Sequence, residues 1–353
     1  MRILGISTLG RGSAVALLDE TSVLFAIEEE KLNRLEDTLE IPRLALARCL
    51  KENQLQLSDC RAIAVAERSP RTSKSSSRRK RQPPSATLEQ LRGLLRGGPR
   101  PSMFEHHLCH AASAYYTSAF NRALILTLDH GTSSQSGLVA LGEADEIRLL
   151  HSLNFPDSLG WFYSRVTELA GLHPSRDEHK LQWLSKDGEP EFLPAFRKLF
   201  SWRANGLPAL NRRYFAAGPD RRGVFAPQFY RELGLSSRNL TVSPALRANL
   251  ACSAQDFLEE TVLQLAANFQ QSTGIRSLCL AGGVFLNVLL VRALETRGPF
   301  DNVYVQPVAG NAGTALGAAY FSRKKITGRS GRGPLPSLAV GVHSSSQEIK
   351  AVL

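Results

Sequence analysis

The sequence has few cysteines, and their spacing fits neither a disulfide framework nor a metal site. Five cysteines are scattered over 353 residues, and no two of them form a CxxC pair. An odd, scattered set argues against a disulfide-stapled fold and against a cysteine zinc site. Such usage is typical of a reducing cytosol, so we expect a cytoplasmic protein.

Long apolar runs are also missing. No stretch reaches the roughly 18 consecutive apolar residues that a membrane helix needs. The N-terminus lacks the long apolar region and the small-residue cleavage site of a signal peptide. Neither GxxxxGK[ST] nor GxGxxG occurs, which excludes a P-loop and leaves no dinucleotide-binding fingerprint. We therefore expect no membrane partner and no nucleotide site of these two kinds.

Excess positive charge is confined to two short segments. The chain has 43 basic and 32 acidic residues; residues 68–81 hold seven of the basic ones and residues 322–332 hold five. The rest of the chain is balanced, with 31 basic and 32 acidic residues. Both segments have the Ser-, Gly- or Pro-rich composition of solvated linkers. Because no aromatic residues interleave with these charges, we expect flexible basic loops and no nucleic-acid partner.

An approximate internal repeat is the strongest indication of the fold. Residues 2–30 and 123–153 each read as a buried strand, a small polar turn and two further strands. Two copies of one unit predict two similar lobes. Strands and helices alternate toward the C-terminus, as in α/β folds with parallel pairing. Apolar spacing predicts helices over 41–54, 88–95, 105–118, 158–172, 250–273, 287–297 and 314–320, and strands over 62–66, 277–281 and 302–307.

Two histidines lie one helical turn apart in the predicted helix over 105–118. His106 and His110 fall on the face opposite the apolar stripe of this helix, so we expect them to face away from the core. Two imidazoles at this spacing can share one metal ion. A solvated or capping pair of histidines has the same spacing and stays an alternative.

Three other places have the sequence of a ligand site. Asp129 ends a buried strand before a small-residue turn, Gly282 and Gly283 lie between a strand and a helix, and residues 310–314 also precede a helix. Paired glycines let a ligand approach the backbone, and a helix N-terminus favours an anion. A tight or capped turn is the structural alternative at each place. Together with the histidines, these places predict a cleft for a nucleotide and a metal.

In these motifs the chain resembles the carbamoyltransferases of the nodulation and antibiotic-tailoring type. The motifs of this family occur in this chain in the same order, from residue 1 to about residue 320. The matching stretches are ILGIS at 3–7, AIEEEKLNR at 26–34, EHHLCHAASAYY at 105–116, SLGWFYS at 158–164, EHK at 178–180, LAGGVFLN at 280–287 and QPVAGNAGTALGAA at 306–319.

The resemblance implies a two-lobed α/β fold of the actin-like type, shared with sugar kinases and Hsp70-like ATPases. It implies a first lobe over residues 1–120, with a disordered basic loop at about 68–86, and a second lobe over 121–321. Residues 322–353 would be a linker toward a C-terminal domain that makes carbamoyl-adenylate from carbamoyl phosphate and ATP. That domain is missing from this sequence, so another chain would supply the carbamoyl-adenylate to the lobes, which transfer the carbamoyl group to a small-molecule hydroxyl or similar acceptor.

The resemblance also implies the site residues. The expected metal is a divalent ion, iron in this family, held by His106, His110, Asp129 and Asn311. His106, His110 and Lys180 would carry catalysis. The carbamoyl-adenylate would bind at small-residue turns and the adenosine-side loop, for which we expect Ser7, Thr132, Gly282, Gly283, Asn287 and Gly310.

Departures from the family pattern cluster at this site. Asn311 stands where the family usually has Asp, Arg11-Gly12 stands where it has His-Asp, and Ser133 stands where it has an acid. Without these three acids, the expected metal site has less negative charge with which to bind a cation. The alternative reading is therefore a degenerate, non-catalytic nucleotide-binding or regulatory homologue. A sugar kinase of the same fold is a third reading, which gives no role to the histidine pair or to the EEEKLNR element.

Overall fold

The computed structural model describes residues 1–8, 11–36, 38–67, 86–131, 135–215, 225–236, 241–342 and 346–352. The chain forms two compact units. Unit 1 comprises residues 1–121, 144–147 and 306–353, and unit 2 comprises residues 122–143 and 148–305. The basic segment 68–81, Thr132 and Ser133 lie outside the described residues, so what we expect of them stays a prediction.

Unit 1 contains a five-stranded sheet of order β3-β2-β1-β4-β5. Its first three strands form an antiparallel meander, and β4 and β5 continue the sheet in parallel with β1. The strands are β1 (Ile3–Ser7), β2 (Ala14–Leu18), β3 (Val23–Glu28), β4 (Ala62–Glu67) and β5 (Ser102–Glu105). The helices are α1 (Glu30–Asn33), α2 (Arg43–Glu52), α3 (Ala86–Leu94), α4 (His106–Tyr115), α11 (Gly313–Thr327) and α12 (Ser346–Val352), with a 3₁₀ turn η1 (Leu57–Asp59).

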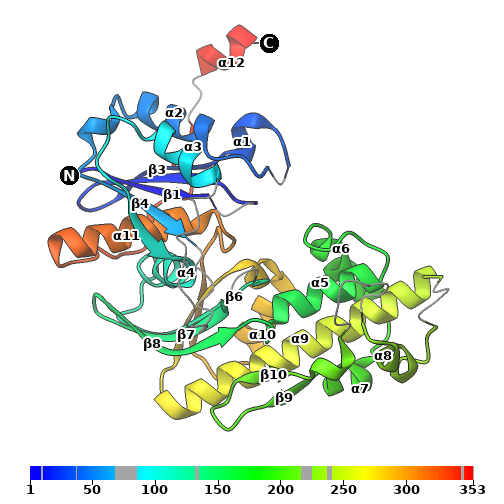
Figure 1. The fold of residues 1–353 in the computed structure, drawn as a ribbon. Coiled ribbons are helices and arrows are strands. Elements are labelled where there is room, and N and C mark those ends of the chain that lie inside the picture. The colour runs from blue at the N-terminus through cyan, green and yellow to red at the C-terminus, as the bar shows by residue number, and fades with distance from the viewer. Residues whose placement is uncertain are drawn as a thin grey trace, which may run out of the picture. The chain divides into compact units, whose positions relative to one another are not determined.

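The two faces of this sheet pack differently. Large apolar side chains, among them Leu4, Leu17 and Phe25, meet α2 and α3 in one core. Small residues on the other face, Ala64 and Ala66, let α4 and α11 approach closely. Figure 1 shows α2 and α3 on one side of the sheet and α11 on the other. The chain thus uses side-chain volume to place α4 against the sheet.

Unit 2 repeats the same topology. Its sheet has the order β12-β11-β6-β7-β8, with β6 antiparallel to β7 and parallel to β11. The strands are β6 (Arg122–Leu128), β7 (Gln135–Glu143), β8 (Glu146–Asn154), β11 (Ser277–Ala281) and β12 (Asn302–Val305). In each unit the strands run third, second, first, fourth and fifth across the sheet. This order confirms the predicted duplication of one α/β unit.

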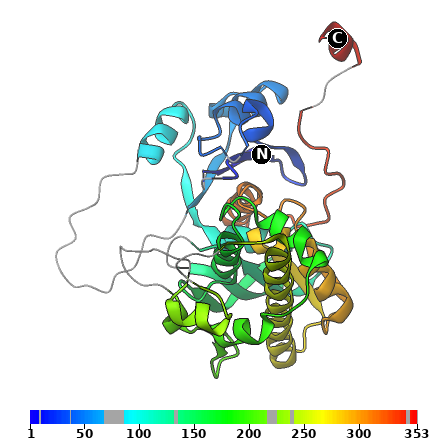
Figure 2. The same cartoon turned by 90° about the vertical axis from the view of Figure 1, so that its right-hand side faces the viewer.

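Helices and a small hairpin complete unit 2. They are α5 (Leu159–Leu169), α6 (Glu178–Leu184), α7 (Leu193–Phe196), α8 (Pro227–Glu232), α9 (Pro244–Thr273) and α10 (Val288–Arg297), 3₁₀ turns η2 (Ser185–Asp187), η3 (Arg197–Leu199), η4 (Arg212–Tyr214) and η5 (Gly283–Leu286), and strands β9 (Phe200–Trp202) and β10 (Pro208–Leu210). Helix α9 begins with Ser243, whose Oγ accepts a hydrogen bond from Leu246 N, and ends at the left-handed Gly274. It is the long yellow helix of Figure 1 and Figure 2, and it packs on α5, α6, α7 and α10.

Two segments differ from what we expected. Helix α11, part of which we assigned to the second lobe, packs on β1 and α4 of unit 1. The expected flexible loop over 322–332 is wrong in its first half, because α11 continues to Thr327. Arg323 is buried there and donates to the carbonyl oxygens of Asp19, Ser330 and Gly331. Composition could not show this, since the partner at Asp19 is distant in sequence. No described helix has the length and apolar character needed to cross a membrane.

Candidate metal and nucleotide site

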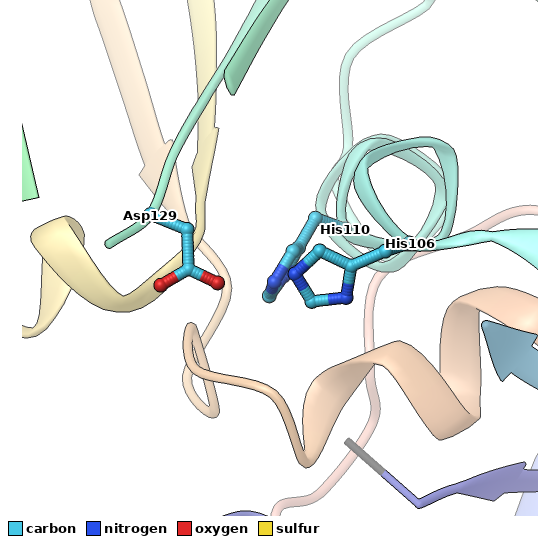
Figure 3. Close-up of side chains that lie close together, drawn as sticks. All are labelled: His106, His110 and Asp129. Atoms are coloured by element: carbon cyan, nitrogen blue, oxygen red, sulfur yellow. The ribbon is translucent and has the colours of Figure 1, made fainter. Parts of the chain in front are cut away.

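The histidine pair lies on α4, directly after strand β5. Glu105 caps this helix, since its Oε2 accepts a hydrogen bond from Leu108 N at 2.8 Å. The rings of His106 and His110 have centroids 4.5 Å apart at an angle of 78°, and a ring nitrogen of each lies within 4.8 Å of one of the other. Figure 3 shows the two rings side by side. The geometry allows both imidazoles to reach one ion.

Both histidines are buried, which corrects one expectation. His106 is 5% exposed and His110 is fully buried, so the pair does not face away from the protein interior. Helix α11 and strands β4 and β5 pack against α4 and cover more of its surface than one apolar stripe predicts. Burial also raises the pKa of Glu105, while the nearby His110 and backbone N–H groups act in the opposite direction. The burial contradicts the solvated pair that we gave as an alternative, and the role of these histidines as metal ligands stays a prediction.

Asn311 lies in the same unit, in the loop before α11. Its Nδ2 donates to the carbonyl oxygen of Arg11 at 3.0 Å. Gly12 has φ of 102°, and a Cβ there would lie 2.9 Å from Asn311 Cβ and from Ala312 N. The turn at 11–12 and the loop at 311–312 are therefore packed together. Two of the departures from the family pattern, Gly12 and Asn311, form one structural unit.

Ser7 and Gly310 are the nucleotide-binding residues that we expect in unit 1. Ser7 ends β1 and is fully buried. Its Oγ has no hydrogen-bond partner among the described residues. Buried hydroxyls are normally satisfied, so such an atom marks a place where a ligand or water fits. The Gly310 carbonyl accepts from Gly313 N at 3.1 Å, in the turn that starts α11.

Asp129 follows β6 in unit 2 and is held by its neighbours. Its Oδ1 accepts from His130 N at 2.7 Å, and its backbone carbonyl accepts from Ser158 Oγ at 3.0 Å. A Cβ on Gly283 would lie 3.0 Å from Asp129 Oδ1, and one on Gly160 would lie 2.8 Å from the Asp129 carbonyl. Gly283 thus lies beside the Asp129 carboxylate, which Figure 3 shows as sticks, and Gly160 lies beside the Asp129 backbone carbonyl.

The glycine turn after β11 is constrained by its own strand neighbour. Gly282 has φ of 101°, and a Cβ there would lie 2.1 Å from the Leu128 carbonyl oxygen. Only glycine fits this conformation and this contact. The side-chain amide of Asn287 is occupied by structural hydrogen bonds. Its Oδ1 accepts from Leu290 N and so caps α10, and the amide forms two hydrogen bonds with the amide of Gln255. The contact with Leu128 is the tight structural turn that we gave as the alternative, and the ligand-binding role of the glycines stays a prediction. The side chain of Asn287, expected to bind the nucleotide, has structural partners instead.

Lys180 lies near the start of α6 and is half-exposed. Its Nζ is 2.9 Å from Asp177 Oδ1. Asp177 also accepts hydrogen bonds from His173, and the Lys180 contact is the main reason that its pKa is well below the usual range. The positive charge of Lys180 is therefore held in an ion pair with Asp177.

Three residues with structural contacts in this region were not predicted from the sequence. Glu29 is buried, and its two carboxylate oxygens accept from Leu44 N and Ala45 N at the start of α2. Glu105 caps α4, and Gly160 makes room for Asp129. The acid immediately before a helix and the glycine within the first turn of a predicted helix were usable signals for the last two. No local pattern connects Glu29 with residues 44 and 45.

Comparison with solved structures supports the fold. The chain is similar to full-length HypF, with a TM-score of 0.54 and 14% identity over 93% of this chain and 56% of that one. It is also similar to component A of (R)-2-hydroxyglutaryl-CoA dehydratase from Acidaminococcus fermentans, with a TM-score of 0.51 and 13% identity over 92% and 98% of the chains. These likenesses confirm the actin-like, two-lobed α/β fold.

Curated relatives are much closer in sequence. The nodulation protein NolNO of Sinorhizobium fredii is 32% identical over 91% of this chain and 47% of its own length. The nodulation protein NolO of Bradyrhizobium diazoefficiens is 33% identical over 67% of this chain and 41% of its own. The chain spans about half the length of the curated relatives it matches. The family model described as the carbamoyltransferase N-terminus matches residues 86–320. The chain therefore belongs to the carbamoyltransferase family and corresponds to its N-terminal part.

Proposed function

We propose that the chain transfers a carbamoyl group from carbamoyl-adenylate to a hydroxyl or similar nucleophile of a small molecule. The observation that carries the proposal is the buried pair His106 and His110 on α4, within the motif EHHLCHAASAYY. Both side chains are buried, and two imidazoles one helical turn apart can share one metal ion. The carbamoyl-adenylate would come from a separate domain or chain that makes it.

The donor set fits a divalent ion. Two histidines and one carboxylate are the ligands of non-haem iron(II) sites with open positions, and His106, His110 and Asp129 supply this set. The side-chain oxygen of Asn311 is the proposed fourth ligand atom, since its amide nitrogen donates to Arg11. When bound, such an ion polarises a carbonyl oxygen as a Lewis acid.

The residues of the chain would bind and orient the carbamoyl donor. The Ser7 hydroxyl, buried and able to donate, would bind an oxygen of the adenylate. Gly282 and Gly283 would let the nucleotide approach the backbone beside Asp129. Lys180, held by Asp177, would supply positive charge against negative charge that develops during transfer. The closed surroundings of the histidines would exclude water, which competes with the acceptor.

Metal titration by calorimetry tests the proposal. Under anaerobic conditions we expect one iron(II) per chain, with zinc and manganese as alternatives. His110→Ala and Asp129→Asn should each weaken binding of the ion by at least about tenfold, which is about 1.4 kcal/mol. His179→Ala and Asp187→Asn remove exposed groups of the same chemistry and should leave the titration unchanged. Metal binding without any effect of His110→Ala would refute this ligand set.

A degenerate, non-catalytic homologue is the second candidate, and one observation favours it. Gly12 and Asn311 replace acids and are packed against each other, so an acidic side chain at residue 12 does not fit the present backbone. The chain has adapted to the loss. If the wild type binds no iron, zinc or manganese and carbamoyl-adenylate is not consumed with any offered hydroxyl compound, the degenerate reading replaces the catalytic one.

A further inference from the structure

The turn between β11 and α10 in unit 2 is fixed at both of its ends. We call residues 282–287 the glycine turn. At its start, a Cβ on Gly282 would lie 2.1 Å from the Leu128 carbonyl oxygen. At its end, Asn287 Oδ1 accepts a hydrogen bond from Leu290 N at 3.0 Å and caps α10. Whatever holds the side chain of Asn287 therefore also holds the far end of the turn.

The amide of Asn287 is paired with the amide of Gln255 on α9. Asn287 Nδ2 donates to Gln255 Oε1 at 2.8 Å, and Gln255 Nε2 donates to Asn287 Oδ1 at 3.1 Å. Both side chains are buried. A carboxamide offers a donor and an acceptor side by side, and this reciprocal pair uses both. The pair thus joins α9 to the glycine turn.

Two further residues use the remaining hydrogen-bonding capacity of Gln255. Tyr163 Oη on α5 donates to Gln255 Oε1 at 2.9 Å, and Gln255 Nε2 donates to Glu259 Oε1 at 2.8 Å. Burial raises the pKa of the Tyr163 hydroxyl, which therefore keeps the proton that it donates. Glu259 in turn pairs with Arg297 in the last turn of α10. The Gln255 amide is held in one orientation, because turning it over would place its NH₂ group against that of Asn287.

We propose that Gln255 is a positioning residue, which holds the glycine turn in the form that receives a nucleotide. A fully satisfied buried network of polar side chains specifies one conformation of the chain around it. Gly283 within the turn lies beside Asp129, since a Cβ there would be 3.0 Å from Asp129 Oδ1. A shift of the turn would therefore change the space next to that carboxylate. The inference rests on the nucleotide role that we propose for Gly282 and Gly283.

Three variants separate hydrogen bonding from packing. Gln255→Met keeps a long side chain and removes the four side-chain hydrogen bonds of Gln255. Asn287→Ser keeps a good N-cap residue for α10 and removes the amide pair. Tyr163→Phe removes a single hydrogen bond from the network. The control is Gln264→Met, because Gln264 is exposed on the same helix and forms a Gln–Asn pair with Asn268 at 2.8 Å.

Hydrogen–deuterium exchange of the ligand-free chain measures the turn itself. In Gln255→Met and Asn287→Ser, the amides of residues 282–290 should exchange at least about tenfold faster, because this segment opens locally more often. The amides of the sheet in unit 1 should exchange as in the wild type. Tyr163→Phe should show a smaller rise, and Gln264→Met should show none. Circular dichroism melts identify any variant that does not fold, in which case Tyr163→Phe decides the comparison.

Calorimetry with AMP measures what the position of the turn does for a nucleotide. Gln255→Met and Asn287→Ser should each bind AMP at least about tenfold more weakly, which is about 1.4 kcal/mol. The double variant should lose little more than either single variant, because both changes remove the same pair. Gln264→Met should bind AMP as the wild type does.

The outcomes distinguish this inference from the proposed function. The positioning role is overturned if Gln255→Met leaves the exchange of residues 282–290 unchanged, or if exchange rises while AMP binds as tightly as before. A wild type that binds no AMP, with the exchange effect of Gln255→Met present, instead refutes the nucleotide role of the turn and leaves its positioning by Gln255 in place.

Discussion

At the scale of single residues, the substitutions that distinguish this chain from its family are coupled. An aspartate at 311 would be the usual metal ligand, but Asn311 is the group that donates to the Arg11 carbonyl. A carboxylate cannot donate that hydrogen bond, and it would place two acceptor oxygens against each other. Asn311 therefore stabilises the turn at Arg11 and Gly12, and its second role, as a metal ligand, stays a prediction.

Asn311→Asp should separate these two roles. We expect the variant to unfold at lower temperature in the absence of metal, because a buried acceptor pair loses its hydrogen, at a cost of about 1–3 kcal/mol. Its affinity for iron(II) or manganese should rise, because a charged carboxylate replaces a neutral amide oxygen. Calorimetric unfolding and metal titration measure the two effects. Lower stability together with unchanged metal affinity would place Asn311 outside the ligand set.

Glu28 gives a prediction of pH dependence. Burial is the main cause that raises the pKa of this carboxyl, and the neighbouring Glu30 raises it further, against the effect of Lys31. The folded chain then keeps the proton to a higher pH than the unfolded chain, so stability falls as pH rises from the ordinary range of a glutamate through the raised value. Glu28→Gln does not ionise. Its free energy of unfolding relative to the wild type should therefore be more favourable near pH 7 than near pH 4, measured by urea unfolding. An equal difference at both pH values contradicts this sign.

At the scale of elements, the contact between α4 and α11 fixes the histidine-bearing helix. Gly317 on α11 faces the backbone of α4, and a Cβ there would lie 1.8 Å from the Cys109 carbonyl oxygen. Gly317→Ala must push the helices apart, and overpacking of this kind costs about 1–3 kcal/mol. Its matched control is Gly93→Ala on α3, where a Cβ meets nothing within 4 Å and should stabilise the helix by about 0.5–1 kcal/mol. Denaturant unfolding should give opposite signs, and loss of stability in both variants would contradict the argument.

Sequence patterns predicted most elements because those signals are local. Asn287 and Ser158, at the starts of predicted helices, are the N-caps of α10 and α5. Tertiary packing was harder to predict from the sequence. The apolar stripe of α4 predicted one buried face, but small residues on the sheet and Gly317 let neighbours cover the histidines as well. Arg323 read as part of a basic linker because its three carbonyl partners cannot be seen from composition.

At the scale of the whole molecule, the duplication could be predicted from the sequence because both copies keep the same order of strands. The candidate site could be predicted only in part. The family resemblance pointed to His106, His110 and Asp129 as ligands, whereas the helical spacing of the histidines alone favoured a solvated or capping pair over a metal pair. Function on this fold therefore has to be argued from sites that long-range packing assembles.

At the same scale, the last prediction concerns the stability that a bound ion would add to the chain. An ion that binds the folded chain and not the unfolded one stabilises the fold by mass action. At a free iron(II) or manganese concentration of 100 times the dissociation constant, linkage predicts about 2.7 kcal/mol of added stability. Differential scanning calorimetry should show unfolding at higher temperature with metal. His110→Ala and Asp129→Asn should lose this shift, whereas His179→Ala should keep it. If Asp129→Asn responds like the wild type, Asp129 is not a ligand and the proposed ligand set is wrong.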